Sequence, residues 1–429
     1  MRFAAGAGSA LPLLLGTLLL AAVLSFLITP LVRALANRLD IVDQPDERRV
    51  NTSPVPRGGG LAVAVAFLVA AAAFLIVNAA SGTPVRAPLT IGDPELIALL
   101  GGGAVAAIVG TLDDRFQLRA RYQLVGQVLI AVAAILLGAT PDQITSPFGG
   151  SFEMSGFLGP AFALLWILGM VNSMNFIDGL DGLSSGIGLI AAATLGLISL
   201  TTAVGPAGLG QPFVAVLCFA LVGSLAGFLR WNFHPATVFA GTSGVLFVGY
   251  TLAILSILGT AKVAVAMLVL GVPIIDTFWV VVRRVAARRS PFTPDRGHIH
   301  HRLLDLGLSH TQTVVLIYAI CIALGAMAIF LPVSGQLVAF VALTGATGLV
   351  FFVLTRRSVD QSRRATIHAA LASGALNDPV PGGAKAAASA ASTVGAAPAA
   401  AATASAAKTA PLPVASPADE PTPQKAASR

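Results

Sequence analysis

The stretch NSMNFIDGLDGL, residues 172–183, places four polar side chains between two long apolar runs. Asn172 and Asn175 are three residues apart, as are Asp178 and Asp181, and each aspartate precedes a glycine. An ionisable pair at a membrane boundary costs several kcal/mol unless it faces a partner, an ion or water. We therefore interpret the stretch as part of a functional site. The alternative is a polar turn that merely ends a membrane span.

The composition around this stretch indicates a polytopic membrane protein. The 429 residues are 56% hydrophobic and only 10% charged, with a mean hydropathy of +0.85, whereas a soluble domain carries about 25% charged residues. A membrane-spanning helix needs roughly 20 apolar residues, and this criterion predicts an all-α protein with about eleven transmembrane helices. The predicted spans are 11–32, 59–79, 95–111, 122–139, 158–174, 183–203, 212–230, 238–258, 262–282, 312–332 and 336–355.

Basic residues predict the orientation of these spans. Fifteen arginines fall in the connections after spans 1, 3, 7 and 9, whereas the connections of the other side hold only Arg86 and Lys262. Because cytoplasmic loops carry an excess of Lys and Arg, we expect the first set of loops and the C-terminus in the cytoplasm and the N-terminus outside. The net charge of +7 is thus accounted for by loops beside spans, and no nucleic-acid partner is expected.

The remaining composition signals concern the chain ends and the cysteines. Residues 1–355 are expected to form one membrane domain. Residues 356–429 are rich in Ala, Pro and Ser, so we expect a disordered cytoplasmic tail. Cys218 and Cys321 lie inside apolar runs and indicate neither a disulfide nor a metal cluster.

All the other polar clusters fall on the same predicted cytoplasmic side. They are residues 43–60, residues 110–123 with Asp113 and Asp114, residues 230–244, and residues 283–303 with the run HIHH. Carboxylates suit a hard cation such as Mg²⁺, and arginine and histidine suit phosphate. Together they favour phosphoryl transfer. The alternatives are that the aspartate pair is a solvated loop and that HIHH binds zinc.

These motifs resemble those of the polyprenyl-phosphate N-acetylhexosamine-1-phosphate transferases, glycosyltransferase family 4. The resemblance covers roughly residues 31–354, and NxxNxxDGLDGL and PDRGHIHHRL are its most specific parts. The HIHH form is more similar to the WecA/TagO branch than to MraY. The resemblance implies eleven spans with cytoplasmic catalytic loops.

The resemblance also implies residue roles. The implied catalytic residues are Asp113, Asp114, His298, His300 and His301. The implied substrate-binding residues are Asn172, Asp181, Asn232, Phe239, Arg296 and Arg302. The implied metal ligands are Asn175 and Asp178, with Mg²⁺ as the cofactor and Mn²⁺ as an alternative.

Two departures from the family pattern stand out. Thr242 replaces an aspartate that is a principal Mg²⁺ ligand in the family motif FxGDSG, and Asn51 replaces a frequent histidine. Asp178, Asp181 or Asp276 could supply the missing charge. Asp276 has an alternative role as an acid paired within the helix bundle.

The resemblance implies transfer of N-acetylglucosamine-1-phosphate, or a related hexosamine phosphate, from a UDP-sugar to undecaprenyl phosphate in the plasma membrane. This would be the first membrane step of cell-envelope polysaccharide synthesis. The alternatives are an MraY-type UDP-MurNAc-pentapeptide transferase, a lipid-sugar flippase, and a catalytically impaired homologue that binds lipid or UDP-sugar. A homodimer is left open.

Overall fold

The computed structural model describes residues 7–44, 54–80, 85, 93–145, 151–201, 211–258, 263–286, 288, 298–332 and 334–346. Its helices are α1 (Ala7–Arg38), α2 (Gly60–Ala80), α3 (Pro94–Phe116), α4 (Ala120–Leu136), α5 (Leu158–Ile177), α6 (Leu183–Thr201), α7 (Pro212–Asn232), α8 (Gly241–Leu258), α9 (Val263–Val269), α10 (Gly271–Ala286), α11 (Ile299–Asp305) and α12 (His310–Phe330). A further apolar helix covers Ser334–Ala346.

The all-α polytopic fold is confirmed. Eight helices in the described part of the chain are long and apolar enough to cross a membrane, and a ninth span is obtained if α9 and α10 are counted together. The helices α4 and Ser334–Ala346 are apolar but shorter. The total of eleven spans therefore stays a prediction.

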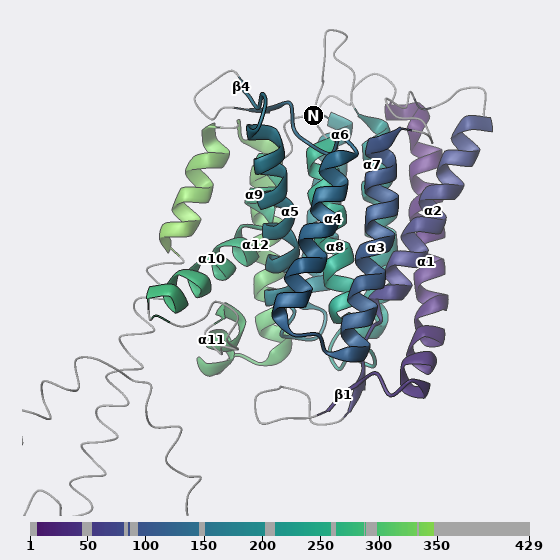
Figure 1. Cartoon of the computed structure of the whole chain (residues 1–429), viewed down its shortest axis with the longest axis vertical. Coiled ribbons are helices and arrows are strands. Elements are labelled where there is room, and N and C mark those ends of the chain that lie inside the picture. Colours follow the sequence, from purple (N-terminus) through teal and green to yellow (C-terminus); the bar gives the residue numbers. More distant parts are fainter. Residues whose placement is uncertain are drawn as a thin grey trace, which may run out of the picture. The chain divides into compact units, whose positions relative to one another are not determined.

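The span predicted over residues 262–282 is not one straight helix. The axes of α9 and α10 differ by 76°, so that α10 runs sideways out of the bundle, above α11 (Figure 1). Gly271 begins α10 and Pro273 follows two residues later. A proline cannot donate the backbone hydrogen bond that a continuous helix would need here, which is a physical reason for the break.

Helices α7 and α8 form the centre of the bundle. Nearly all residues of α8 are buried, and this helix packs against α3 and α5, while α7 packs against α1 and α6. Gly223 and Gly227, one turn apart on α7, let α1 approach closely, because a Cβ at either position would lie 2.1 or 2.2 Å from the carbonyl oxygen of Leu18 or Ala22. This close packing supports helix association in lipid.

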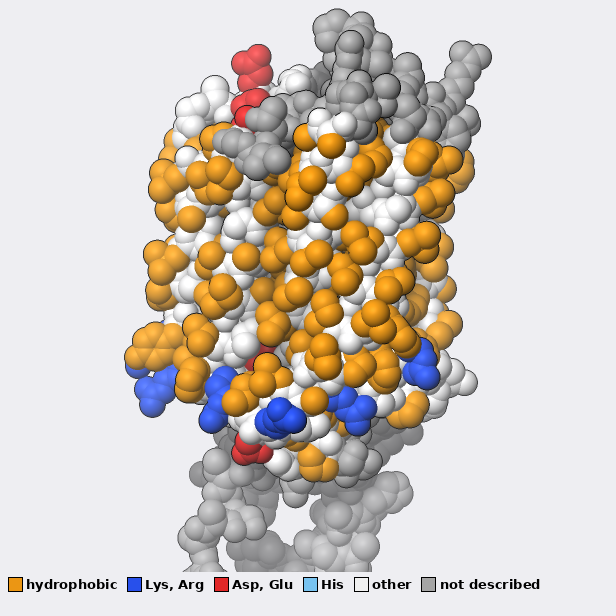
Figure 2. Space-filling model, turned by 90° about the vertical axis from the view of Figure 1, so that its right-hand side faces the viewer, with side chains coloured by type: hydrophobic (Ala, Val, Ile, Leu, Met, Phe, Trp, Pro, Cys, Tyr) orange, Lys and Arg blue, Asp and Glu red, His pale blue; other side chains and the backbone are white. Residues whose placement is uncertain are grey.

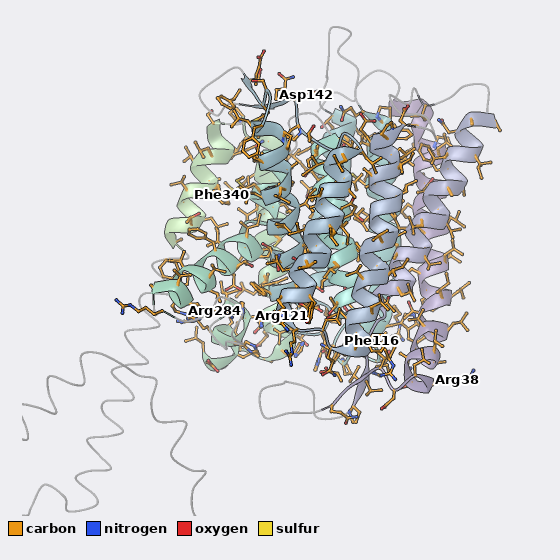
Figure 3. All side chains as sticks on the ribbon, in the orientation of Figure 1. Arg38, Phe116, Arg121, Asp142, Arg284 and Phe340 are labelled. Carbon is orange, nitrogen blue, oxygen red and sulfur yellow. The ribbon has the colours of Figure 1, made fainter. Side chains whose placement is uncertain are left out.

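One end of the bundle carries all the arginines among the described residues. An apolar surface lies above a belt of basic side chains (Figure 2). Arg38, Arg121 and Arg284 are near this end, and Asp142 is at the opposite end (Figure 3). We call it the arginine end. Helices α1, α3, α5 and α7 all finish there, so it gathers the polar loops.

Two short antiparallel hairpins lie at opposite ends of the bundle (Figure 1). Strand β1 (Val42–Asp43) pairs with β2 (Val55–Pro56) at the arginine end, and β3 (Gln143–Thr145) pairs with β4 (Ser151–Glu153) at the other. The predicted domain boundary and the tail of residues 356–429 lie outside the described residues, as does Asn51.

Candidate active site

The aspartate pair lies in the last turn of α3 and holds the beginning of α8. Asp114 is buried, and its Oδ1 accepts a hydrogen bond from the backbone amide of Thr242 at 2.8 Å while its Oδ2 accepts one from the amide of Ser243 at 3.0 Å. These amides belong to the first turn of α8, where a helix has unsatisfied donors and a partial positive charge. Asp114 thus supplies the negative charge that this helix terminus favours.

Thr242 occupies the position where the family motif has an aspartate. Its hydroxyl group donates a hydrogen bond to Asp113. The distance from Thr242 Oγ1 to Asp113 Oδ2 is 2.6 Å. Asp113 Oδ1 accepts from Gln123 Nε2 at 2.7 Å and from the amide of Leu118 at 3.0 Å. A carboxylate has about four acceptor sites; Asp113 uses three of them, and Asp114 accepts the two amides and also interacts with the Ser243 side chain. Both acids keep some capacity for a ligand.

Asp178 directly follows α5 and is the third acid of the site. Its Oδ1 accepts from Ser184 Oγ at 2.5 Å. Burial raises the pKa of Asp178 to about 6, and the charges of Asp114 and Asp181 act in the same direction while Arg57 opposes them. Asp178 therefore lies within electrostatic reach of both Asp114 and Asp181. Arg57 itself pairs with Asp43 at 3.2 Å.

The raised pKa of Asp178 predicts a pH-dependent stability. A carboxyl whose folded pKa exceeds its ordinary value of 3.8 adds stability at low pH, and this contribution is lost as the pH rises through about 6. In EDTA, we expect the melting temperature of the natural chain to fall between pH 5 and pH 7 by more than that of Asp178→Asn. Parallel melting curves for the two proteins would contradict this.

Two predicted substrate-binding asparagines have their amides in contacts within the bundle. Asn172 Nδ2 donates to Gln127 Oε1 at 2.7 Å and so joins α5 to α4. Asn232 is buried, and it accepts from Ser185 Oγ at 2.8 Å and donates to the carbonyl of Val238 at 3.0 Å. Asn175 lies one turn after Asn172 and is half-buried. In this structure Asn172 and Asn232 position helices.

Phe239 belongs to the loop between α7 and α8 and is half-buried. Its amide donates to the carbonyl of Pro56 at 2.8 Å, and its carbonyl accepts from the amide of Gly59 at 2.9 Å. The polar loop of residues 43–60 is therefore hydrogen-bonded to the polar loop of residues 230–244. These bonds bring Arg57, next to Pro56, to the acids.

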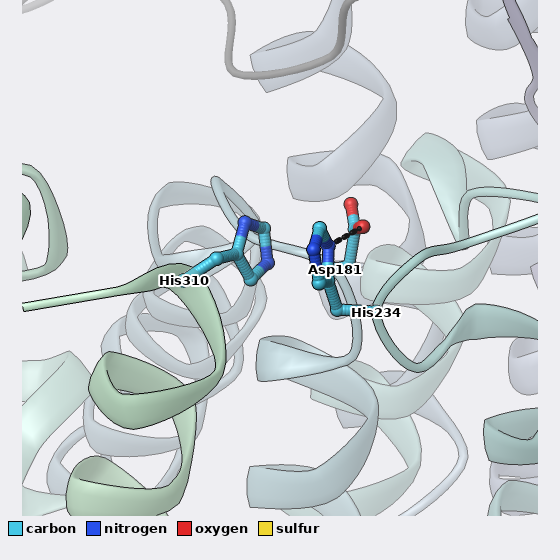
Figure 4. A group of neighbouring side chains, drawn as sticks. All are labelled: Asp181, His234 and His310. Carbon is cyan, nitrogen blue, oxygen red and sulfur yellow. Dashed lines mark hydrogen bonds and ion pairs between the residues drawn. The ribbon is translucent and has the colours of Figure 1, made fainter.

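Asp181, His234 and His310 converge from three elements (Figure 4). Asp181 Oδ2 accepts from the amide of Ala236 at 3.1 Å and lies 2.7 Å from His234 Nδ1. One ligand atom from each of the three side chains lies within 4.8 Å of the others. The rings of His234 and His310 are stacked, however, with centroids 4.1 Å apart and planes 18° apart. Lone pairs of nearly parallel rings do not converge on one ion, so this arrangement is a stacked pair anchored by Asp181.

The HIHH run forms the first turn of α11 and packs against the stretch 172–183. His298 Nδ1 lies 2.8 Å from Asp276 Oδ2, and the His298 ring is 5.7 Å from that of Phe176. His300 is buried, and burial lowers its pKa well below the ordinary value. Burial therefore favours the neutral form of His300. His301 and Arg302 are half-buried, whereas Arg296 lies outside the described residues.

The buried His300 ring packs on Gly179, the glycine that follows Asp178. A Cβ at Gly179 would lie 2.1 Å from His300 Nε2. Overpacking of this kind costs typically about 1–3 kcal/mol, so we expect Gly179→Ala to lower both the melting temperature and any turnover. Gly169→Ala is the control, because a Cβ at this exposed position on α5 meets nothing within 4 Å. Equal behaviour of the two variants would contradict the contact.

Comparison with known proteins connects this site to a family. The model of glycosyl transferase family 4 matches residues 96–260. The chain is 36% identical over 301 residues to a probable undecaprenyl-phosphate N-acetylglucosaminyl 1-phosphate transferase of Bacillus subtilis, covering 68% of this chain and 78% of the relative. The chain belongs to glycosyl transferase family 4. It is also 36% identical to a decaprenyl-phosphate N-acetylglucosaminephosphotransferase of Mycobacterium leprae, covering 70% and 79% of the two chains, and 26% identical to the undecaprenyl-phosphate alpha-N-acetylglucosaminyl 1-phosphate transferase of Escherichia coli K12, covering 66% and 75%.

The glycosyl transferase family 4 match contains the acids and amides of the site but not α11. The structure brings Asp113, Asp114 and Asp178 together at the arginine end, while Asp181 anchors the stacked histidines nearby. Sequence reasoning missed His310, which lies outside the polar clusters, and it did not predict that Gln123, although within the cluster of residues 110–123, is a hydrogen-bond partner of Asp113. It named Asp276 as a candidate source of the missing charge and, alternatively, as an acid paired within the helix bundle. The assigned roles of the individual residues stay predictions.

Proposed function

We propose that this chain transfers N-acetylglucosamine-1-phosphate from UDP-N-acetylglucosamine to a polyprenyl phosphate such as undecaprenyl phosphate, releasing UMP. The observation that carries the proposal is that three motif acids meet at the arginine end of a membrane bundle whose relatives are named as such transferases. An anionic lipid headgroup and a nucleotide diphosphate both suit an end rich in arginine.

In this reaction an oxygen of the acceptor phosphate bonds to the β-phosphorus of the UDP-sugar. The bond from that phosphorus to the bridging oxygen breaks, and UMP leaves with the electron pair. A phosphate monoester has a second pKa of about 6, so the acceptor is mostly ionised at pH 7 and needs little help from a base. The chain therefore acts chiefly by positioning and charge neutralisation. Asp113 or Asp114 would accept the proton from the minor fraction of acceptor that is still protonated.

The carboxylates fit a hard divalent cation. Carboxylate oxygens are ligands that Mg²⁺ prefers. Burial raises the pKa of Asp178, and the charges of Asp114 and Asp181 add to this shift, a repulsion that a cation would relieve. We propose Asp178 and Asn175 as the holders of Mg²⁺, or Mn²⁺, with Asp113 and Asp114 beside them. When bound, the ion would neutralise the donor diphosphate.

We further propose that the arginine end faces the cytoplasm of a bacterial plasma membrane and that the N-terminus is outside, following the positive-inside bias. Cysteine accessibility tests this orientation. A cysteine in place of exposed Arg119 should react with a membrane-impermeant maleimide only after cells are opened, whereas one in place of exposed Asp142 should react in intact cells. The reverse pattern would invert the topology.

Thr242 favours a second candidate, a homologue that binds lipid or UDP-sugar without turnover, because a hydroxyl that donates to Asp113 is a poorer metal ligand than a carboxylate. The deciding experiment incubates purified full chain with undecaprenyl phosphate and radiolabelled UDP-N-acetylglucosamine, with Mg²⁺ or with EDTA. Parallel reactions use UDP-N-acetylgalactosamine and UDP-MurNAc-pentapeptide.

Lipid-linked label with UMP release only in Mg²⁺ supports the transferase, and the preferred donor identifies the sugar. Binding of a UDP-sugar without product supports the second candidate. Neither binding nor product with any donor overturns both.

A further inference from the structure

Asp276 has both carboxylate oxygens directed at α11. It lies on α10 and is only 1% exposed. Its Oδ2 is 2.8 Å from His298 Nδ1, and its Oδ1 accepts the backbone amide of Ile299 at 2.8 Å. One side chain thus holds the imidazole that precedes α11 and the first amide of that helix.

The bend between α9 and α10 places Asp276 where it can contact His298. Because the helix axis turns by 76°, α10 runs sideways out of the bundle, with α11 below it on the side of the arginine end (Figure 1). Asp276 and His298 are 22 residues apart, and part of the connection between them lies outside the described residues. The carboxylate therefore reaches His298 because of tertiary structure.

This geometry speaks against Asp276 as the substitute for the missing carboxylate at Thr242. Both of its oxygens face α11, whereas Thr242 contacts Asp113 and Asp114. An oxygen that accepts an amide proton fixes the carboxylate plane, so the second oxygen faces the imidazole in a defined direction. Such an acceptor selects the tautomer with the proton on Nδ1 and leaves Nε2 as the basic nitrogen.

We propose that Asp276 is a positioning residue that fixes the orientation and tautomer of His298, so that Nε2 can take up a proton and, in the imidazolium form, donate a hydrogen bond to the donor diphosphate. This inference rests on the proposed function for the role of His298, but the pairing and the tautomer do not depend on it. A carboxylate behind a histidine has this effect in other enzymes, where loss of the partner costs activity through the histidine.

Asp276→Asn separates positioning from simple structural support. The asparagine oxygen can still accept the Ile299 amide, but its NH₂ group faces His298 Nδ1 and favours the tautomer protonated on Nε2. We expect a nearly unchanged melting temperature and a loss of turnover on the order of 100-fold. Asp305→Asn is the matched control, because this residue is on α11 but exposed.

A double-mutant cycle supplies the second readout. If Asp276 acts through His298, then adding Asp276→Asn to His298→Ala should change turnover by less than about twofold, since coupled residues are not additive. If the loss of turnover in the double variant equals the product of the losses in the two single variants, the proposal is overturned. It is also overturned if Asp276→Asn turns over substrate as fast as the natural chain.

Nitrogen-15 NMR of the histidine-labelled full chain tests the pairing without turnover. The chain has six histidines, and His298→Ala identifies the His298 signal by its absence. We expect Nδ1–H in the natural chain and Nε2–H in Asp276→Asn, and an unchanged tautomer would overturn the inference. If the natural chain is inactive with every donor, the proposed function fails while the NMR result still decides the pairing.

Discussion

Replacing Asp114 by alanine is expected to lower turnover at least about 100-fold and to destabilise the protein. The carboxylate accepts the amides of Thr242 and Ser243 at the first turn of α8, and each buried donor left without a partner costs about 1–3 kcal/mol. Loss of two such bonds would displace the start of a helix that is buried along almost its whole length. The measurements are initial rate and melting temperature in one detergent.

Asp114→Asn refines this prediction. Its oxygen can satisfy one amide, but its NH₂ group must then face the other, so we expect a loss of stability between those of alanine and the natural chain. Asp142→Asn is the matched control, since Asp142 is exposed at the opposite end. If the Asp114→Ala variant is as stable as the natural chain, Asp114 does not hold the start of α8. If the variant has the turnover of the natural chain, Asp114 has no part in the mechanism.

The helices could be predicted from the sequence because lipid imposes one rule on every span. A long apolar stretch in a bilayer satisfies its backbone only as a helix, so length and hydropathy locate α2 and α5 through α8 to within a few residues, whereas α1 extends beyond its predicted span at both ends. The bend before α10 was missed although Gly271 and Pro273 lie inside the predicted span. Membrane helices tolerate both residue types, so their presence alone does not predict a break.

The location of the site was also predictable, but its internal pairing was not. Charge asymmetry placed the polar loops at one end of the bundle, and the structure puts the acids there. The contact of Thr242 with Asp113 joins residues 129 positions apart. Such pairings depend on how α3 approaches α8, where Gly110 allows backbone contact with Ser243. Motif spacing contains no information on that approach.

Thr242→Asp is expected to make the stability of this protein strongly dependent on Mg²⁺. In EDTA the new carboxylate replaces a hydroxyl that donates to Asp113 Oδ2 at 2.6 Å, and two like charges about 4 Å apart near a protein surface repel by roughly 4 kcal/mol. The partial positive charge at the N-terminus of α8 stabilises an acid in the first turn by about 1 kcal/mol, which offsets only part of this repulsion. A substantially lower melting temperature without metal follows.

Mg²⁺ should restore the melting temperature that Thr242→Asp loses in EDTA. A ligand that binds only the folded state stabilises it in proportion to the logarithm of its concentration over its dissociation constant, so titration of the melting temperature yields an affinity without any turnover. We expect Thr242→Asp to bind Mg²⁺ at least about tenfold more tightly than the natural chain, because three carboxylates then surround one position. Thr242→Asn has a similar shape and no charge, so it should show neither the loss in EDTA nor the gain in Mg²⁺.

The comparison of rates then separates the two candidate functions. Turnover by the natural chain that Thr242→Asp does not increase would mean that Asp113, Asp114 and Asp178 suffice for the cation. Turnover only in Thr242→Asp would make the natural chain a binding homologue whose defect is one carboxylate. A Thr242→Asp variant as stable in EDTA as the natural chain, with no larger response to Mg²⁺, would place residue 242 outside any cation site.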